Sequence, residues 1–376
     1  MKMPLTSVLS PRGEGQGEGE LSMKLNAKKI LIMRYRFIGD TVLTVPFLRN
    51  LRQAYPDAHI DLMLEPFSGQ VLEGCPYVDR TIPFEFKTIH KYSGSSQRGK
   101  LAGYVHYWKF MRQEGYDAAF VLKRSLSSAL LIRAAGIPRR IGFATEGRTL
   151  LLTDPVPYRQ DRHEVQNFLD CLRVLDIPVH SDALELWPSA ENDAKARELF
   201  SDAGWKKDDL KIVIHAAASL PAKQWPLDRF AAVMKVMQER YNAHFIYTGA
   251  PADAALYQEI ERLGPFKGMN LCGKIGLHAN LSVYRAAHLF FGVDSGPMHM
   301  AAAVRVPVVA LFGPTDERKW GPWGDGHTVI TRRLSCYPCK PHKCPDNECM
   351  KKIRVEEALE AVEKKLGAIM PKIRYH

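Results

Sequence analysis

The segment from residue 289 to residue 315, LFFGVDSGPMHMAAAVRVPVVALFGPT, constrains the fold of this chain more than any other stretch. Its apolar opening, LFFGV, predicts a buried strand that ends at Asp294. The residues SGP then turn the chain into a short alanine-rich helix, and the residues from Val306 to Phe312 predict the next strand. Strand, turn, helix and strand in this order indicate an α/β protein in which the two strands lie parallel.

The turn in this segment has the features of an anion site. Backbone N–H groups and the positive end of the helix dipole converge there, which favours a phosphate. Pro297 fits the first helical position, and Gly296 lets a ligand approach the backbone. Asp294 would repel a phosphate, so we expect it to meet sugar hydroxyls or to orient a neighbouring donor. Two alternatives stay open: Asp294 and Ser295 are also good helix caps, and His299 either reaches a phosphate or packs.

Strands alternate with helices along almost the whole chain, in two blocks. In the first block, apolar patterns predict strands at 28–36, 58–65 and 116–123, and helices at 41–54, 126–135 and 163–176. In the second block, they predict strands at 211–218 and 243–249, and helices at 192–203, 227–240, 252–263 and 355–366. This alternation predicts two Rossmann-like domains, each a doubly wound parallel sheet whose ligand site lies at the carboxyl ends of its strands and faces a shared cleft.

Shifts in composition divide the chain into four parts. Residues 1–23 are rich in glycine and glutamate, and we expect a disordered leader there. The first domain is predicted at 24–180 and the second at 181–350, with an irregular linker at 177–188 that suits a hinge. Residues 351–376 hold a closing helix, for which packing back on the first domain is one open arrangement.

The excess of basic residues gives the chain a formal net charge of +11. Such a balance favours acidic partners: a nucleic acid, an anionic lipid surface or a phosphorylated substrate. No apolar run approaches the ~20 residues that span a bilayer, and no secretory signal peptide is evident. We therefore expect a cytoplasmic protein.

The seven cysteines fall into two groups. Three of them, Cys75, Cys171 and Cys272, stand among apolar neighbours and are interpreted as buried thiols. The other four form a C-x2-C-x4-C-x4-C cluster: Cys336, Cys339, Cys344 and Cys349. Close spacing of this kind can hold a structural zinc ion, although the second half of the pattern is not a standard zinc knuckle. A site of four thiolates leaves no position open for substrate.

Asp40 follows the first predicted strand and stands at a turn that Gly39 permits. At the carboxyl edge of a sheet, its carboxylate can accept a proton from an attacking hydroxyl. The alternative is a helix cap, because an aspartate before Thr41 and an apolar run suits that position equally well. Local sequence does not decide between a base and a cap.

A second group of polar residues follows the first strand of the second block, in HAAASLPAKQWP. Small residues there leave room for a ligand against the backbone. Ser219 offers a hydroxyl and Lys223 a compact positive charge, which beside a diphosphate would offset the charge that builds on a leaving group. We interpret Lys223 as functional because it stands between a strand end and a helix start.

Five segments in this order resemble the glycosyltransferase family 9 heptosyltransferases, which build the inner core of lipopolysaccharide. They are ILIMRYRFIGDTVLTVPFLRNLRQAYPDAHIDLMLE, RRIGF, HEVQNFLDCLRVLDIP, HAAASLPAKQWP and GVDSGPMHMAAAVRVPVVALFGPTD. The resemblance extends from Ile30 to Trp323, and the terminal cysteine cluster also recurs in some members of the family. It implies a GT-B fold, in which the first domain holds the acceptor and the second holds the nucleotide-sugar.

The resemblance also implies a reaction: inverting transfer of heptose from ADP-heptose, without a catalytic metal or other cofactor. Asp40 matches the general base proposed for the family. The positions that match donor-binding residues are Ser219, Lys223, Asp294, Ser295, Gly296 and His299. A different nucleotide-sugar or a different acceptor within the same family is the main alternative.

A basic and aromatic segment in the first domain suits an anionic, lipid-anchored glycan acceptor at the inner face of the cytoplasmic membrane. Between residues 87 and 114, basic residues outnumber acidic ones, and tyrosines and a tryptophan stand among them. The residues expected to contact the acceptor are Arg36, Lys91, Arg98 and Lys100. The alternative is a solvated loop and helix face. No known nucleic-acid-binding module is recognised in the sequence, so we do not expect a nucleic acid as partner.

Two other classes of function are alternatives to sugar transfer. A nicotinamide-dependent oxidoreductase shares the alternating fold, but its G-x-G-x-x-G after the first strand is absent, because that segment is YRFIGD. A non-catalytic protein that binds a nucleotide or a membrane would need neither Asp40 nor Lys223.

Overall fold

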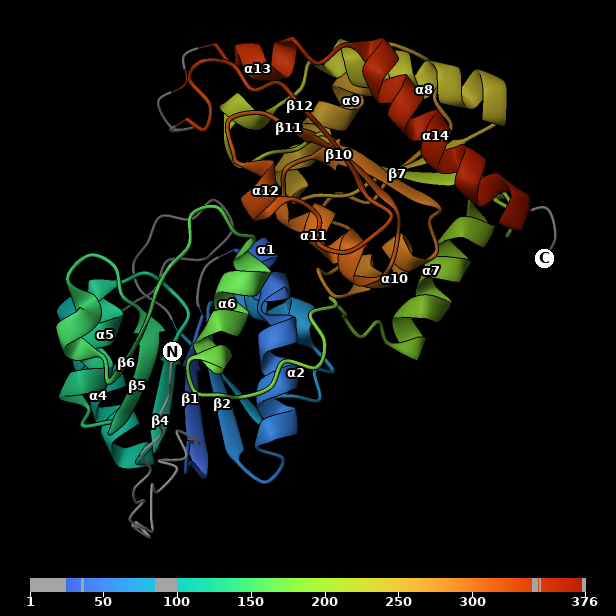
Figure 1. The fold of residues 1–376 in the computed structure, drawn as a ribbon. Helices are drawn as coiled ribbons and strands as arrows, with labels where there is room; N and C mark the ends of the chain where they lie inside the picture. The colour runs from blue at the N-terminus through green and yellow to red at the C-terminus, as the bar shows by residue number, and fades with distance from the viewer. Residues whose placement is uncertain (1–24, 35–36, 85–99, 340–343, 345, 374–376) are drawn as a thin grey trace, which may run out of the picture.

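The computed structural model describes residues 25–34, 37–84, 100–339, 344 and 346–373, and within them the chain builds two parallel sheets (Figure 1). The predicted leader lies outside these residues. The strands of the first sheet are β1 (Lys29–Met33), β2 (His59–Leu64), β3 (Arg80–Pro83), β4 (Ala118–Val121), β5 (Arg139–Phe143) and β6 (Asp154–Val156). Those of the second sheet are β7 (Lys211–His215), β8 (His244–Tyr247), β9 (Gly268–Asn270), β10 (Leu289–Val293), β11 (Val308–Phe312) and β12 (Thr328–Thr331).

The two sheets share one strand order. The first runs β3-β2-β1-β4-β5-β6, and the second, from its opposite end, runs β9-β8-β7-β10-β11-β12. This is the doubly wound Rossmann order, in which ligands bind where the order reverses, at the carboxyl ends of the strands. The reversal lies between β1 and β4 in the first sheet and between β7 and β10 in the second. The prediction of two doubly wound parallel sheets is confirmed.

Helices cover both faces of each sheet. The helices of the first half are α1 (Ile38–Leu43), α2 (Val45–Ala54), α3 (Pro66–Gly69), α4 (Lys100–Glu114), α5 (Leu126–Ala134) and α6 (Glu164–Arg173). Those of the second half are α7 (Ala190–Asp202), α8 (Leu227–Tyr241), α9 (Ala254–Arg262), α10 (Ala279–Arg285), α11 (Gly296–Ala303), α12 (Glu317–Trp320), α13 (Glu348–Lys351) and α14 (Val355–Ile373). None of the helices in the described part combines the length and the apolar character that crossing a bilayer requires.

The alternation of side chains along β1 explains the layers of the first half. Leu31 and Met33 pack with apolar residues of α4 and α5 on one face, whereas Ile30 and Ile32 join a larger core on the other face. That larger core includes Phe168 of α6 and continues into the second half of the chain, where β10 and α11 contribute to it. The two halves therefore share one continuous apolar core at their junction.

The predicted helix at 41–54 is divided into α1 and α2. Thr44 separates the two helices, and Pro46 stands at the start of α2, where a missing N–H donor costs no hydrogen bond. The first helix is therefore short and begins three residues earlier than the apolar pattern indicated, so that Asp40 lies inside it. This shift excludes the helix cap as an interpretation of Asp40.

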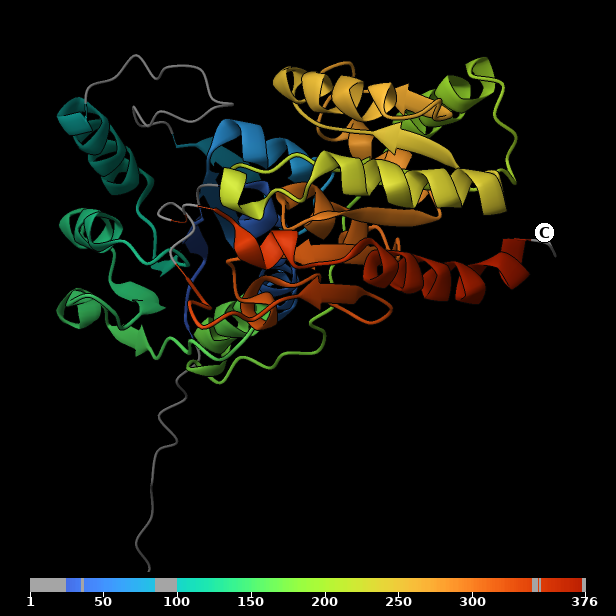
Figure 2. The ribbon, with the colours of Figure 1, turned by 90° about the horizontal axis from the view of Figure 1, so that it is seen from above.

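The linker and the closing helix fix how the halves are joined. Between α6 and α7 the chain has no helix or strand, and Asn50 of α2 holds it by donating to Ser181 O (2.7 Å) and accepting from His180 N (2.7 Å). The hinge remains a prediction. The helix α14 packs on α8 and on the second sheet, beside α8 in both views (Figures 1 and 2), instead of on the first domain.

Candidate active site

The first corner of the candidate site forms where the first sheet reverses. Arg34 follows β1, and its Nη2 lies 2.5 Å from Asp40 Oδ1 of α1. The guanidinium also donates from Nη1 to Leu122 O at 3.4 Å and lies over the Phe168 ring, 4.8 Å from its centroid. A backbone carbonyl after β4 and an aromatic ring of α6 thus fix Arg34, and Arg34 fixes the carboxylate of Asp40.

Asp40 is not the cap of its helix. The N-cap position of α1 belongs to Phe37, whose φ of 54° lies in the left-handed region, and no side chain caps the helix there. Such backbone strain in a non-glycine residue is often found beside functional groups. Of the two interpretations that the sequence left open, the cap is wrong, and the base stays a prediction.

The surroundings of Asp40 suit a group that exchanges protons. Its side chain is 13% exposed, and burial raises the pKa of its carboxyl above the ordinary 3.8. The nearby Arg34 guanidinium lowers this pKa, and the Glu164 carboxylate raises it again. A carboxylate with a raised pKa is a stronger base than a solvated one, which is what removing a proton from an alcohol requires.

The second corner forms at the reversal of the second sheet. Lys223 ends a short 3-10 turn after β7, and its Nζ donates to Asp294 Oδ2 at 2.6 Å. The Thr315 hydroxyl, which follows β11, donates to the same oxygen at 2.5 Å. Asp294 itself follows β10 and is 7% exposed. Of the roles considered for Asp294, the geometry agrees with orienting a neighbouring donor, since it holds the Lys223 ammonium.

The start of α11 offers polar groups with no partner in the protein. Ser295 occupies the N-cap position, yet its side chain makes no capping hydrogen bond. Within the described residues, Ser295 Oγ and His299 Nδ1 are buried atoms without a hydrogen-bond partner. Free amides at the start of a helix, together with an unused hydroxyl, can receive an anion. Ser219 is exposed in the loop after β7, the strand that neighbours β10.

The two corners meet through α1 and α11, which pack directly against each other. A Cβ added at Gly39 would stand 2.7 Å from His299 Cδ2, and one added at Gly296 would stand 2.9 Å from Ile38 Cβ. Both glycines are therefore needed for the close approach of the two helices. His299 packs against the first domain here, and burial lowers its pKa to about 3, so its imidazole is neutral.

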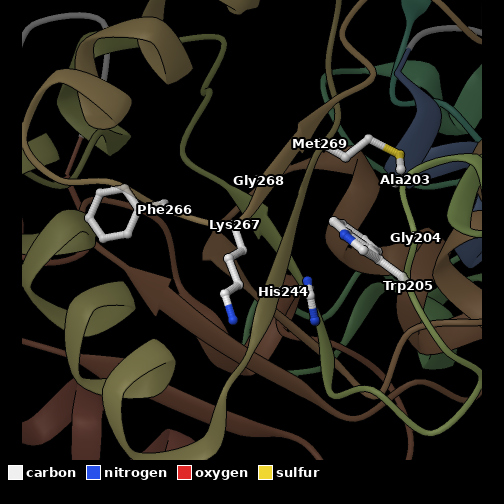
Figure 3. Close-up of a pocket in the computed structure, with 8 residues that line it drawn as sticks. All are labelled: Ala203, Gly204, Trp205, His244, Phe266, Lys267, Gly268 and Met269. Carbon is white, nitrogen blue, oxygen red and sulfur yellow. The ribbon is translucent and has the colours of Figure 1, made fainter.

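Two surface hollows lie away from this junction. One, of about 460 Å³, is lined by Ala203, Gly204, Trp205, His244, Phe266, Lys267, Gly268 and Met269 (Figure 3). It lies at the amino ends of β8 and β9, opposite the edge that carries Lys223 and Asp294. The other, of about 260 Å³, is lined by the end of β6, the loop that follows it, and the later part of α6 with Val174. Neither contains a predicted site residue.

Most of the predicted acceptor contacts cannot be placed. Arg36, Lys91 and Arg98 lie outside the described residues, and Lys100 is the first residue of α4. Two aromatic residues of the same segment pack against the first domain: the Tyr107 hydroxyl donates to Pro83 O at 2.9 Å, and Trp108 Nε1 donates to Ala134 O at 2.9 Å. These two side chains therefore serve the packing of α4.

The cysteine cluster shows no metal site within the described residues, where no group of three or more His, Cys, Asp or Glu side chains could hold a metal ion. All seven cysteines are free thiols. Cys349 is buried at the start of α13, and the Cys339 N–H donates to Pro314 O at 3.2 Å. Burial, with Cys336 and Cys344 nearby, raises the pKa of the Cys339 thiol.

Four residues of the junction were not singled out from the sequence. Arg34 lies in the first strand segment, Thr315 follows the last strand of the β-turn-α-β segment, Glu164 opens a predicted helix, and Lys319 stands in a charged run. Each has a partner far along the chain, so local patterns give no signal for it. Arg34, Glu164 and Thr315 do lie within segments that carry the family resemblance.

Comparisons with known proteins agree with this geometry. The sequence model of the protein family "Glycosyltransferase family 9 (heptosyltransferase)" matches residues 104–350 of this chain. Lipopolysaccharide heptosyltransferase 3 of Escherichia coli K12 is 30% identical over 351 residues, which cover 89% of this chain and 97% of that protein. The chain is also similar to two solved E. coli structures. One is ADP-heptose lipopolysaccharide heptosyltransferase II, with a TM-score of 0.73, 24% identity and coverage of 91% and 99% of the two chains. The other is heptosyltransferase WaaC with ADP, with a TM-score of 0.68, 19% identity and coverage of 90% and 99%. These structural likenesses confirm the predicted GT-B arrangement.

Proposed function

Because the chain belongs to glycosyltransferase family 9, the heptosyltransferase family, we propose that it transfers heptose from ADP-heptose to a hydroxyl of the lipopolysaccharide inner core. The meeting of the two corners through α1 and α11 is the observation that carries the proposal. It brings a buried carboxylate with a raised pKa close to a lysine and to the open start of a helix. A base, a cation and backbone amides are what a displacement at a sugar carbon next to a diphosphate requires.

In the proposed reaction, Asp40 accepts the proton of the acceptor hydroxyl. The oxygen forms a bond to the anomeric carbon of heptose from the face opposite the diphosphate. The bond between that carbon and the diphosphate oxygen breaks, and ADP leaves with the electron pair, so that the configuration inverts. Holding both substrates in line between the two domains supplies much of the acceleration, because a neutral alcohol is a weak nucleophile.

Lys223 and the start of α11 stabilise the departing ADP in this mechanism. The Lys223 ammonium is held by Asp294 at 2.6 Å, so little reorganisation is needed when negative charge develops on the diphosphate. The unused Ser295 hydroxyl and the first amides of α11 add hydrogen-bond donors. These groups supply the positive charge that other transferases take from a metal ion.

We further propose that the face formed by α4 and α5 contacts the inner side of the cytoplasmic membrane, where the acceptor is anchored. Four apolar side chains on these packed helices are exposed: Leu101, Val105, Leu126 and Leu130. Exposed cations accompany them on the same helices, namely Lys109, Arg112 and Arg133. Apolar side chains among cations are typical of surfaces that bind anionic lipid.

The structural zinc ion at the cysteine cluster stays a proposal as well. It is supported by the pKa of the Cys339 thiol, which Cys336 and Cys344 both raise. This effect indicates that the three cysteines lie near one another. We expect the purified protein to contain about one zinc ion per chain. Cys336→Ser should lower this zinc content, and Cys75→Ser should leave it unchanged. Zinc below a tenth of the protein concentration would overturn the proposal.

The test of the main proposal is transfer itself. Purified protein is mixed with ADP-heptose and with lipopolysaccharide from a heptose-deficient strain, and both the released ADP and the mass of the glycan are measured. We expect one heptose to be added, and Asp40→Ala to abolish transfer with ADP still bound. Asp170→Asn is the matched control, because Asp170 is similarly buried and ion-paired but lies on the far part of α6.

Two further measurements define the donor and the membrane contact. The base of the nucleotide donor is tested by measuring how much ADP, UDP and GDP each raise the melting temperature of the protein. A larger rise with UDP would mean that the donor is a UDP-sugar and not ADP-heptose.

The α4–α5 face is tested by sedimentation with anionic vesicles. The double variant Leu101→Gln with Leu130→Gln should bind vesicles more weakly. Leu263→Gln, which changes an exposed leucine of the second domain, should bind them as the wild type does.

A further inference from the structure

A buried carboxylate of the first domain has its countercharge in the second domain. Glu164, the first residue of α6, is 3% exposed and accepts a hydrogen bond from the Tyr158 hydroxyl. Among the described residues its ion-pair partner is Lys319 of α12, whose Nζ lies 3.6 Å from Glu164 Oε1. A tyrosine hydroxyl carries no charge, so the positive charge that faces this carboxylate within ion-pair distance comes from the other domain.

Lys319 is built into the junction of the domains. Its side chain is about nine-tenths buried, with its Nζ donating to Gln160 Oε1 at 3.1 Å and lying 4.5 Å from the centroid of the Tyr158 ring. Beside it, His163 Nε2 makes a hydrogen bond with Gly321 O at 3.0 Å, and the His163 ring lies on the Trp323 ring, with centroids 4.4 Å apart. A solvated surface lysine would not be enclosed in this way.

Glu164 also faces the carboxylate assigned as the base. The charged groups that act on Asp40 are Arg34 after β1, Lys123 and Arg124 after β4, and Glu164 on α6. Of these, the Glu164 carboxylate raises the pKa of Asp40, and the three cations lower it. From the second domain, the His299 imidazole lies against Gly39 and is neutral. The groups that act on Lys319 itself are Glu164, Arg124 and Asp316.

We propose that Lys319 is a positioning residue that makes the base of the first domain depend on contact with the second, because it neutralises Glu164 and leaves the Arg34 guanidinium to Asp40 alone. Without Lys319, two buried carboxylates share the cations of the first domain. Neighbouring carboxylates of this kind bind a proton more tightly as a pair. A protonated Asp40 accepts no proton from the acceptor, so transfer stops.

This inference rests on the proposed function and adds regulation to it. A base that becomes active only when Lys319 enters the first domain acts only after the two domains have enclosed both substrates. Closure that completes a catalytic site is a general means of coupling substrate binding to reaction. Here the coupling would be electrostatic and would require a single ammonium group.

The experiment follows kcat of heptose transfer between pH 5 and pH 9 in four variants: Lys319→Met, Lys319→Arg, Glu164→Gln and the double variant Lys319→Met with Glu164→Gln. We expect Lys319→Met to move the acidic limb of the profile upward by about one pH unit, which lowers kcat about tenfold at pH values on that limb. Glu164→Gln should move that limb downward. The arginine variant and the double variant should both stay close to the wild type.

The outcomes separate this inference from the proposed function. If wild-type protein transfers heptose and Asp40→Ala does not, but Lys319→Met keeps the wild-type acidic limb, the inference fails and the function stands. A double variant no better than Lys319→Met also overturns it, because neutralising Glu164 then fails to restore the base. If the wild type transfers no heptose, the function fails, and the inference, which rests on it, fails as well.

Discussion

Each of the two sheets carries an ion pair between a basic residue and an aspartate at the point where its strand order reverses, but the surroundings of the two pairs differ. In the first sheet, Arg34 and Asp40 lie 2.5 Å apart, and in the second, Lys223 and Asp294 lie 2.6 Å apart. The Asp40 carboxyl has a second carboxylate nearby, and its pKa is raised. One oxygen of Asp294 accepts hydrogen bonds from two donors, Lys223 and Thr315.

This difference teaches that similar ion pairs on similar sheets can serve opposite purposes. In the proposed mechanism, the cation at the first corner steadies a carboxylate that accepts a proton. The carboxylate at the second corner steadies a cation that faces the leaving group. The distances alone would not separate the two roles, whereas the neighbours of each carboxylate do.

The largest effect is expected at the first corner. Asp40→Asn keeps the size of the side chain but removes the proton acceptor, so kcat should fall by about 10²- to 10⁴-fold. The dissociation constant of ADP, measured by calorimetry, should stay within about twofold, because the proposed mechanism places ADP at the other corner. Weakened ADP binding with little change in kcat would contradict the roles assigned to the two corners.

At the second corner the effect should be divided between activity and stability. Lys223→Met removes the charge that faces the diphosphate, and kcat should fall by about 10²-fold. It also leaves the buried Asp294 carboxylate without its cation, which costs about 3–5 kcal/mol in the free energy of unfolding. The double variant Lys223→Met with Asp294→Asn should recover much of the stability and none of the activity, as urea unfolding and transfer assays would reveal.

The contact between the corners should tolerate no added methyl group. In Gly39→Ala, the new Cβ would stand 2.7 Å from His299 Cδ2, so the buried His299 ring or the helices α1 and α11 must shift. A displacement of this size should lower kcat by about tenfold to a hundredfold. The matched control is Gly276→Ala, an exposed position where nothing lies within 4 Å of an added Cβ. Equal activity of the two variants would show that the close approach of α1 and α11 is dispensable.

The smallest effect concerns the neutral histidines at the junction. Burial lowers the pKa of His299 to about 3 and that of His163 to about 4, from an ordinary 6.5. Below pH 6.5 the unfolded chain therefore binds protons that the folded chain does not, and stability falls as the pH is lowered towards 4. Each histidine contributes a slope of up to about 1.4 kcal/mol per pH unit. The free energy of unfolding is measured with urea at several pH values from 4.5 to 7.5. It should depend less steeply on pH in His163→Gln than in the control His180→Gln, where the substituted histidine is exposed.

Central strands could be predicted from the sequence because both of their faces are buried. The strands β1, β7, β10 and β11 stand out as continuous apolar runs, and the β-turn-α-β segment folds as its pattern indicates. The strands β3, β5, β6, β9 and β12 were not predicted. Of these, β9 and β12 lie at the two edges of the second sheet, and their residues are half-buried or exposed, so no apolar run marks them.

The candidate site was predictable only in part. Asp40, Lys223 and Asp294 were identified because each stands at the carboxyl end of a strand, where an α/β fold binds ligands. Their partners were missed. Thr315 meets Asp294 across 21 residues of sequence, and Lys319 meets the first domain across more than 150, so only the folded chain brings them together.

The position of α14 has a practical consequence for engineering. Since this final helix lies on α8 and the second sheet, the chain crosses between the two domains once in its described part, in the segment between α6 and α7. A single splice there would graft the first half of a relative onto the second half of this protein with no further exchange. If the first domain holds the acceptor and the second the nucleotide, as proposed, such hybrids would recombine acceptor choice while the preference for the nucleotide is inherited unchanged.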